Sequence, residues 1–226
     1  MAGDAARHAV SKNREPPGRE LPGGAGIRGA IAQRDGRSTA YILTWYPLWG
    51  GLAGAIGAEL FLYSAPAHEA AAAFAAAVLW ILVRFAERFA IGLSYPWVLN
   101  LAVGVCWLVA LQRFQPSRVL PAAIAAHTIS RAGAIGLAWV SRPAAAGFVL
   151  SLKVRTPPAL LAMAQGVAAA FLGGMRAGLL LTAASYLVLR LLQEWCYKRR
   201  GGIDAAGFSG AQAALEVAAI GVWSVL

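Results

Sequence analysis

Residues 70–83 read AAAAFAAAVLWILV, a run without one charged side chain. Similar apolar blocks recur along the chain, each close to the ~20 residues that a helix needs to cross a bilayer. Hydrophobic residues make up 59% of the sequence and charged residues 13%, about half the share of charged residues in soluble domains. We therefore predict an all-α fold, a polytopic helical membrane bundle with about seven transmembrane helices.

The apolar blocks divide the chain into a tail and a membrane domain. Residues 1–40 are polar, rich in Gly, Pro, Ala and Arg, and have no apolar core of the kind found in signal peptides, which predicts a disordered basic cytoplasmic tail. Residues 41–226 form the predicted transmembrane domain. Its seven predicted helices cover residues 41–63, 67–83, 89–111, 119–140, 158–174, 177–192 and 210–226.

The distribution of positive charge predicts a lipid partner and an orientation. The net charge is +10, yet the basic residues stand beside apolar blocks, which indicates contact with the lipid bilayer and no nucleic acid partner. Most Lys and Arg residues fall in the tail and around residues 84–88, 141–158 and 197–210. The positive-inside rule then predicts an N-in/C-out topology, with these three connections facing the cytoplasm.

One of these connections, residues 197–216, reads YKRRGGIDAAGFSGAQAALE. Basic residues, glycines and a following helix can hold a phosphate, because backbone N–H groups and the helix dipole attract an anion. The same residue types also end one membrane helix and begin another. The pattern alone leaves both interpretations open.

A second candidate lies inside the predicted fourth helix, where His127 and Arg131 are four residues apart and share a face. Ionisable residues inside a membrane segment are costly and usually face the bundle interior or a water-filled cavity. They would either meet an anionic substrate or form an internal ion pair, with Glu59 and Glu216 as the expected partners. A small membrane transporter is one function that these residues would fit.

Three segments resemble the cobalamin synthase family, also called adenosylcobinamide-GDP ribazoletransferase. They are YPLWGGLAGAIGAE (residues 46–59), SRAGAIGLAWVSRPAAAGF (residues 130–148) and RRGGIDAAGFSGAQAALEV (residues 199–217). Where the family carries an acidic motif after its second helix, this chain reads VRFAERFAIG, with Glu87 as its one acid. In the closing segment Asp204 is displaced by one residue.

The resemblance implies a multi-pass protein of the bacterial inner membrane that transfers α-ribazole onto adenosylcobinamide-GDP, a corrinoid nucleotide substrate, with release of GMP. It implies Mg²⁺ as cofactor, with Glu87 and Asp204 as the remaining metal-ligand candidates. The implied phosphate-binding residues are Arg131, Arg142, Arg199, Arg200, Gly201 and Gly202. The alternative is a non-catalytic relative that binds a cobamide precursor or scaffolds a complex, as a homo-oligomer or with other cobalamin-assembly proteins.

Overall fold

The computed structural model describes residues 36–91, 97–144 and 154–226, and about 90% of these residues are helical, with no β-strand among them. The prediction of an all-α fold is confirmed. In chain order the elements are α2 (Gly36–Ile91), α3 (Trp97–Leu111), α4 (Pro116–Val140), α5 (Thr156–Ala170), the 3₁₀ turn η1 (Phe171–Gly173), α6 (Met175–Arg200) and α7 (Ala205–Val225).

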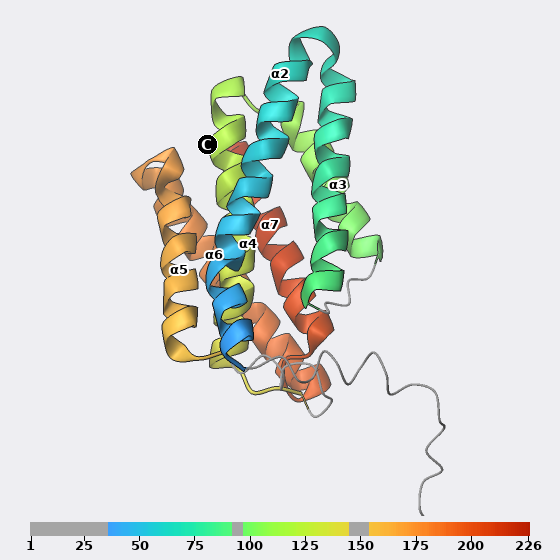
Figure 1. The fold of residues 1–226 in the computed structure, drawn as a ribbon. Helices are drawn as coiled ribbons and strands as arrows, with labels where there is room; N and C mark the ends of the chain where they lie inside the picture. The colour runs from blue at the N-terminus through green and yellow to red at the C-terminus, as the bar shows by residue number, and fades with distance from the viewer. Residues whose placement is uncertain (1–35, 92–96, 145–153) are drawn as a thin grey trace, which may run out of the picture. The chain divides into compact units, whose positions relative to one another are not determined.

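Helix α2 consists of two arms that meet at His68, where the backbone leaves the helical region with φ −154° and ψ 82°. Pro66 lies just before this point, and a proline inside a helix removes one backbone hydrogen bond and favours a kink. In Figure 1 the first arm, in blue, rises to a bend and the second arm, in green, returns beside it. This agrees with the two separate helices predicted over residues 41–63 and 67–83.

Four helical segments of the described residues are long and apolar enough to cross a membrane. They are residues Ile42–Glu87, Thr156–Gly173, Met175–Arg200 and Ala205–Val225. Helix α3 is apolar but has only 15 residues, and α4 is not one of the four although it has 25. The chain therefore has the helices of a membrane protein, while the seven crossings and the N-in/C-out orientation stay predictions.

Several predicted boundaries differ from the observed ones. Helix α6 continues to Arg200, two turns beyond the predicted end at residue 192, and α7 begins at Ala205, so the connection between them is only residues 201–204. Residues 84–88, predicted as a cytoplasmic connection, lie within α2, and so do residues 36–40 of the predicted tail. Residues 1–35 of that tail and the central part of the predicted loop 141–158 (residues 145–153) lie outside the described residues.

Helix α4 lies among the other helices and packs against α2, α5 and α7 (Figure 1). Its close approach to the first arm of α2 depends on glycines. A Cβ atom at Gly50 would lie 2.6 Å from the carbonyl oxygen of His127, and one at Gly54 would lie 2.5 Å from that of Ala123. Small residues at helix contacts in membranes allow such close backbone approach, so these glycines bring α2 against the polar part of α4.

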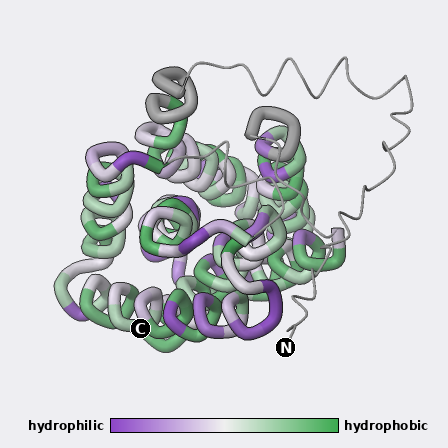
Figure 2. The backbone as a smooth tube through the Cα atoms, turned by 90° about the horizontal axis from the view of Figure 1, so that it is seen from below, coloured by the Kyte–Doolittle hydropathy of each residue, from purple (hydrophilic) through white to green (hydrophobic). Residues whose placement is uncertain are grey.

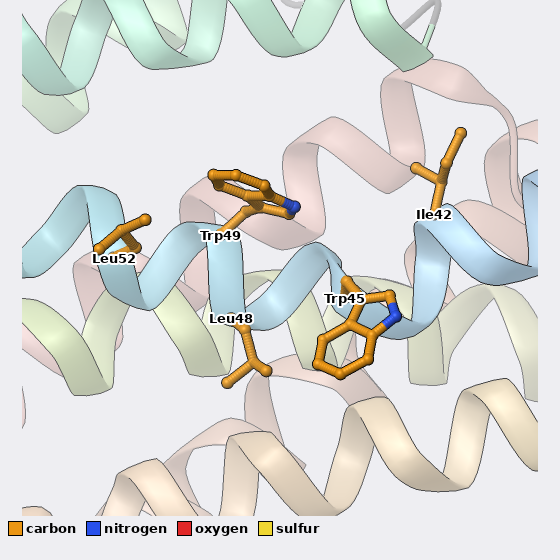
Figure 3. Close-up of a pocket in the computed structure, with 5 residues that line it drawn as sticks. All are labelled: Ile42, Trp45, Leu48, Trp49 and Leu52. Carbon is orange, nitrogen blue, oxygen red and sulfur yellow. The ribbon is translucent and has the colours of Figure 1, made fainter.

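The outer surface of the bundle is apolar. In Figure 2 the helices are mostly green or white, and purple is confined to the connections and a few helical turns. Figure 3 shows one such face on α2, where five exposed apolar side chains border a shallow hollow of about 570 Å³: Ile42, Trp45, Leu48, Trp49 and Leu52. The five described residues that line this hollow are apolar, so they offer contact to lipid.

Candidate functional site

Five ionisable residues from three helices form a buried ion network inside the bundle: Arg84, Glu87, His127, Arg131 and Glu216. The first pair of the network joins Arg84 of α2 to Glu216 of α7, and both side chains are almost completely buried. The other carboxylate oxygen of Glu216 accepts a hydrogen bond from the indole N–H of Trp107 in α3, at 2.7 Å. Glu216 thus ties together the second arm of α2, α3 and α7.

The second pair joins Arg131 of α4 to Glu87 of α2. The Nε atom of Arg131 donates to Glu87 Oε1 at 2.8 Å. The opposite oxygen of Glu87 accepts from the Tyr46 hydroxyl at 3.0 Å and from the Gln212 amide at 3.3 Å. Every oxygen of this carboxylate is therefore used by a partner from α2, α4 or α7.

His127 connects the two pairs. Its Nδ1 atom lies 3.6 Å from Glu216 Oε2 and 3.3 Å from Arg131 Nη1, which also donates to the His127 carbonyl oxygen at 2.9 Å. The imidazole ring is stacked on Trp107, with ring centres 5.4 Å apart and an interplanar angle of 11°. Its Nε2 atom is buried and has no hydrogen-bond partner among the described residues.

Charge balance explains how this network is tolerated inside an apolar bundle. Two guanidinium groups face two carboxylates, so the network is electrically neutral when His127 is neutral. An isolated charge would be very costly at this depth, whereas paired and hydrogen-bonded charges are the arrangement that buried sites require. Because both carboxylates are ion-paired, the network holds α2, α4 and α7 together. Neither Glu87 nor Glu216 is free to act as a general base.

The connection between α6 and α7 is held against the end of α4. Gly201 ends α6 in the left-handed region at φ 71°, which favours glycine. Residues 142–144 and 203 then pair as a short bridge, with Ile203 N–H donating to Arg142 O and Ala144 N–H donating to Ile203 O, both at 3.0 Å. The Arg142 side chain closes the turn by donating from Nε to the Gly201 carbonyl oxygen at 2.7 Å.

The first turn of α7 is capped from within. The Asp204 carboxylate accepts from the Gly207 N–H at 2.7 Å, and Arg200 donates to both Asp204 oxygens, at 2.7 and 2.6 Å. An anion already occupies the position that a helix N-terminus would offer to a phosphate. Lys198 and Arg199, which directly precede Arg200 in the last turn of α6, are exposed and form no ion pair with a described residue.

The predicted phosphate-binding residues fall into two groups. Arg142, Arg199, Arg200, Gly201 and Gly202 are together at the α6–α7 connection. Arg131 is separate from them, because it is completely buried and paired with Glu87. Gly202 has a packing role, since a Cβ atom there would lie 2.6 Å from the Arg142 carbonyl oxygen.

The two metal-ligand candidates do not form a common site. Glu87 is bound by Arg131, Tyr46 and Gln212, while Asp204 is bound by Arg200 and caps α7. Gln212 is eight residues after Asp204, about 12 Å along an α-helix. In the part of the chain that the structure describes, no three His, Cys, Asp or Glu side chains come together as metal ligands would. Glu87 and Asp204 therefore do not share one metal site among the described residues, and Mg²⁺ as a cofactor stays a prediction.

Sequence reasoning named four members of the buried ion network, Glu87, His127, Arg131 and Glu216, but assigned Glu87 to a metal site. Arg84 was expected in a cytoplasmic connection but is buried against Glu216, and Glu59, an expected partner of Arg131, is exposed. The spacing of Arg84 and Glu87, and that of Gln212 and Glu216, would have indicated further polar helix faces to pair with that of His127 and Arg131.

No family model, no curated protein and no solved structure matches the chain.

Proposed function

We propose that this chain is a membrane-embedded relative of the cobalamin synthases that binds a phosphate-bearing corrinoid nucleotide without transferring α-ribazole to it. One observation carries the proposal: the α6–α7 connection is pinned to residues 142–144, while Lys198 and Arg199 beside it are exposed and form no ion pair with a described residue. The resemblance of the three sequence segments supplies the class of ligand.

The binding chemistry follows from the position of these two cations. Lys198 and Arg199 belong to the last turn of α6, whose backbone is fixed by the Gly201 turn and by Arg142. A lysine and an arginine that are exposed and form no ion pair with a described residue can bind phosphate oxygens through charge-assisted hydrogen bonds. We therefore expect Lys198 and Arg199, at the C-terminal end of α6, to contact the diphosphate of adenosylcobinamide-GDP.

The ion pairs of Glu87 and Asp204 favour binding of the nucleotide without transfer of α-ribazole. Glu87 and Asp204 each already compensate the charge of an arginine, Arg131 and Arg200 respectively. Transfer with release of GMP, as in the family that the sequence resembles, would require these carboxylates to exchange their arginine partners for Mg²⁺. Transfer remains the second candidate, and the same experiment distinguishes the two.

The test uses the full chain in detergent micelles and adenosylcobinamide-GDP, followed by the absorbance of the corrinoid in equilibrium dialysis. The double variant Lys198→Gln/Arg199→Gln removes the two cations, and Arg113→Gln/Arg118→Gln makes the same change of charge beside the start of α4. Loss of hydrogen bonds to a charged group costs about 1.5–3 kcal/mol, so the first variant should weaken binding at least about tenfold. The control variant should bind as the unaltered chain does.

A parallel incubation with α-ribazole and Mg²⁺ measures GMP by chromatography. The proposal expects no GMP above a protein-free blank. GMP release that depends on the protein would establish the transferase and overturn the non-catalytic reading. Absence of corrinoid binding by the unaltered, folded chain would overturn the proposed function altogether.

A further inference from the structure

A second, separate feature of the bundle is a groove of about 190 Å³ between α4, α5 and α6. Small residues give it depth. Gly166 of α5 lies directly against Ala132 of α4, and Gly133 of α4 lies against Leu215 of α7 behind it, so that a Cβ atom at either glycine would collide with these side chains. The floor of the groove is therefore formed by closely packed helices, and its mouth opens on the outer surface beside Tyr186.

Water does not suit this groove. A water molecule takes about 30 Å³ and needs two to four polar partners, yet the lining is apolar except for the hydroxyl groups of Thr182, Ser185 and Tyr186. Two of the three helices, α5 and α6, lie within segments that can cross a membrane. A hydrocarbon chain of the surrounding lipid is the occupant that such a lining solvates.

The depth of the groove matches one leaflet of a bilayer. Gln193 of α6 donates to Ser141 Oγ at the end of α4 at 3.1 Å, which places these two residues at the same level. The lining residues Ile129 of α4 and Leu181 of α6 are each twelve residues before Ser141 and Gln193, or about 18 Å along a helix. Half of a ~30 Å hydrocarbon core is about 15 Å, so the groove covers the depth that one lipid tail occupies.

Arg190 lies at the depth in the bilayer where the headgroup of that lipid would lie. Arg190 directly follows Leu189, which lines the groove, and donates to Gln193 Oε1 at 3.0 Å. Because Gln193 is bonded to Ser141, the Arg190 guanidinium is held on the side of α6 that faces α4. It is 54% exposed, and its ion pair with Glu194 is long, at 3.9 Å. Long basic side chains near helix ends extend to the interface, where anionic phosphate is their natural partner.

We propose that this groove binds one acyl chain of an anionic phospholipid, with the lipid phosphate on Arg190. The chain lies against Gly133, Met163 and Gly166, and Ser185 forms part of the wall on α6. This site shares no residue with the corrinoid site at Lys198 and Arg199. Two observations together identify an anionic phospholipid as the ligand. The groove is lined by apolar residues over the depth of one leaflet, and the exposed Arg190 lies next to its end.

The experiment reconstitutes the full chain in vesicles of equal parts phosphatidylglycerol and phosphatidylcholine, extracts it in mild detergent and counts retained lipids by native mass spectrometry. The unaltered chain should retain one phosphatidylglycerol. Ser185→Phe fills the groove and should lose it, whereas Ala183→Phe, an equal enlargement on an exposed position of α6 outside the groove, should keep it. Arg190→Gln should lower the preference for phosphatidylglycerol over phosphatidylcholine about fivefold, since one interfacial cation contributes ~1 kcal/mol.

A second groove-filling variant, Val167→Phe, replaces Ser185→Phe if thermal unfolding shows that the latter is not folded. Equal lipid retention by the folded groove-filling variants and the unaltered chain would overturn the proposal. So would a chain that carries no lipid and forms a dimer sensitive to Ser185→Phe, because a second copy would then cover the groove. Displacement of the bound molecule by inorganic phosphate alone would also overturn it, since a lipid is held by its chain.

Discussion

Arg84 and Glu216 are 132 positions apart in the sequence and form an ion pair in which both side chains are almost completely buried. The pair joins the second arm of α2 to α7, the last helix of the chain. Removal of one partner from a buried pair is far more damaging than removal of both, because it leaves a buried charge uncompensated. The pair is therefore the place where the stability of the bundle can be tested most directly.

The variant Glu216→Gln should lower the free energy of unfolding by about 3–5 kcal/mol, because the buried Arg84 guanidinium then loses the carboxylate that it contacts in α7. The measurement is reversible unfolding in mixed micelles, followed by tryptophan fluorescence. The matched control is Glu194→Gln, which removes an acid that is 54% exposed, and its effect should stay below about 1 kcal/mol.

The double variant Arg84→Met/Glu216→Leu should recover much of the stability lost in Glu216→Gln, since apolar side chains of similar volume often replace a buried ion pair without loss. If the double variant were less stable than Glu216→Gln, the pair would not be the source of the loss. Thermal unfolding of Glu216→Gln, the double variant and the unaltered chain in the same detergent decides between these outcomes.

Trp107→Phe tests the hydrogen bond that supports the same carboxylate. Phenylalanine keeps an aromatic ring beside His127 but removes the N–H group that donates to Glu216 at 2.7 Å. Loss of a hydrogen bond to a charged group should destabilise the protein by about 1.5–3 kcal/mol. Trp97→Phe, at a residue that is 71% exposed, is the control and should change the unfolding free energy little.

Gly202→Ala should open the contact between the α6–α7 connection and the end of α4. The added methyl group would lie 2.6 Å from the Arg142 carbonyl oxygen and 2.7 Å from the Ala144 nitrogen, so the backbone must move, at a cost of about 1–3 kcal/mol. Faster cleavage at residues 199–204 in limited proteolysis is the expected result. Gly210→Ala has open space around its new atom and lies within α7, so it should leave the cleavage rate unchanged.

Reporter fusions test the predicted orientation. A fluorescent protein fused after Leu226 should stay dark when the C-terminus is exported, whereas a periplasmic phosphatase at the same position should be active. The positive-inside rule is the physical basis of this N-in/C-out prediction. The reverse pattern, with a bright C-terminal fluorescent protein, would show an even number of crossings or an inverted bundle.

Periodicity and composition predicted the helices well, because apolar length is a local property of the sequence. Residues 70–83 identify their helix without help from any other part of the chain. The C-terminal end of α6 was harder to predict. Lys198, Arg199 and Arg200 suggested a loop, but they belong to the helix, which continues two turns further than predicted and ends at Gly201. Basic residues are favourable at the C-terminal end of a helix, where they oppose its dipole, so the same pattern fits both outcomes.

The partners inside the site could not be read from local patterns. Glu59 and Glu216 were the expected partners of Arg131 or His127. Glu216 lies 3.6 Å from His127, but Arg131 pairs with Glu87, 44 positions away. The choice depends on how α2 folds back at His68 and on which face its second arm turns to α4. Helix spacing can show that a residue needs a partner, while only the packing of the helices shows which residue that is.

The late position of Glu216 has a consequence for how the protein is made. Arg84 is synthesised 132 positions before the carboxylate that it contacts in α7. The contact between the second arm of α2 and α7 can therefore form only after nearly all of the chain has been made. A chain truncated before residue 205 would lack α7 and would have to fold without this link between the two segments.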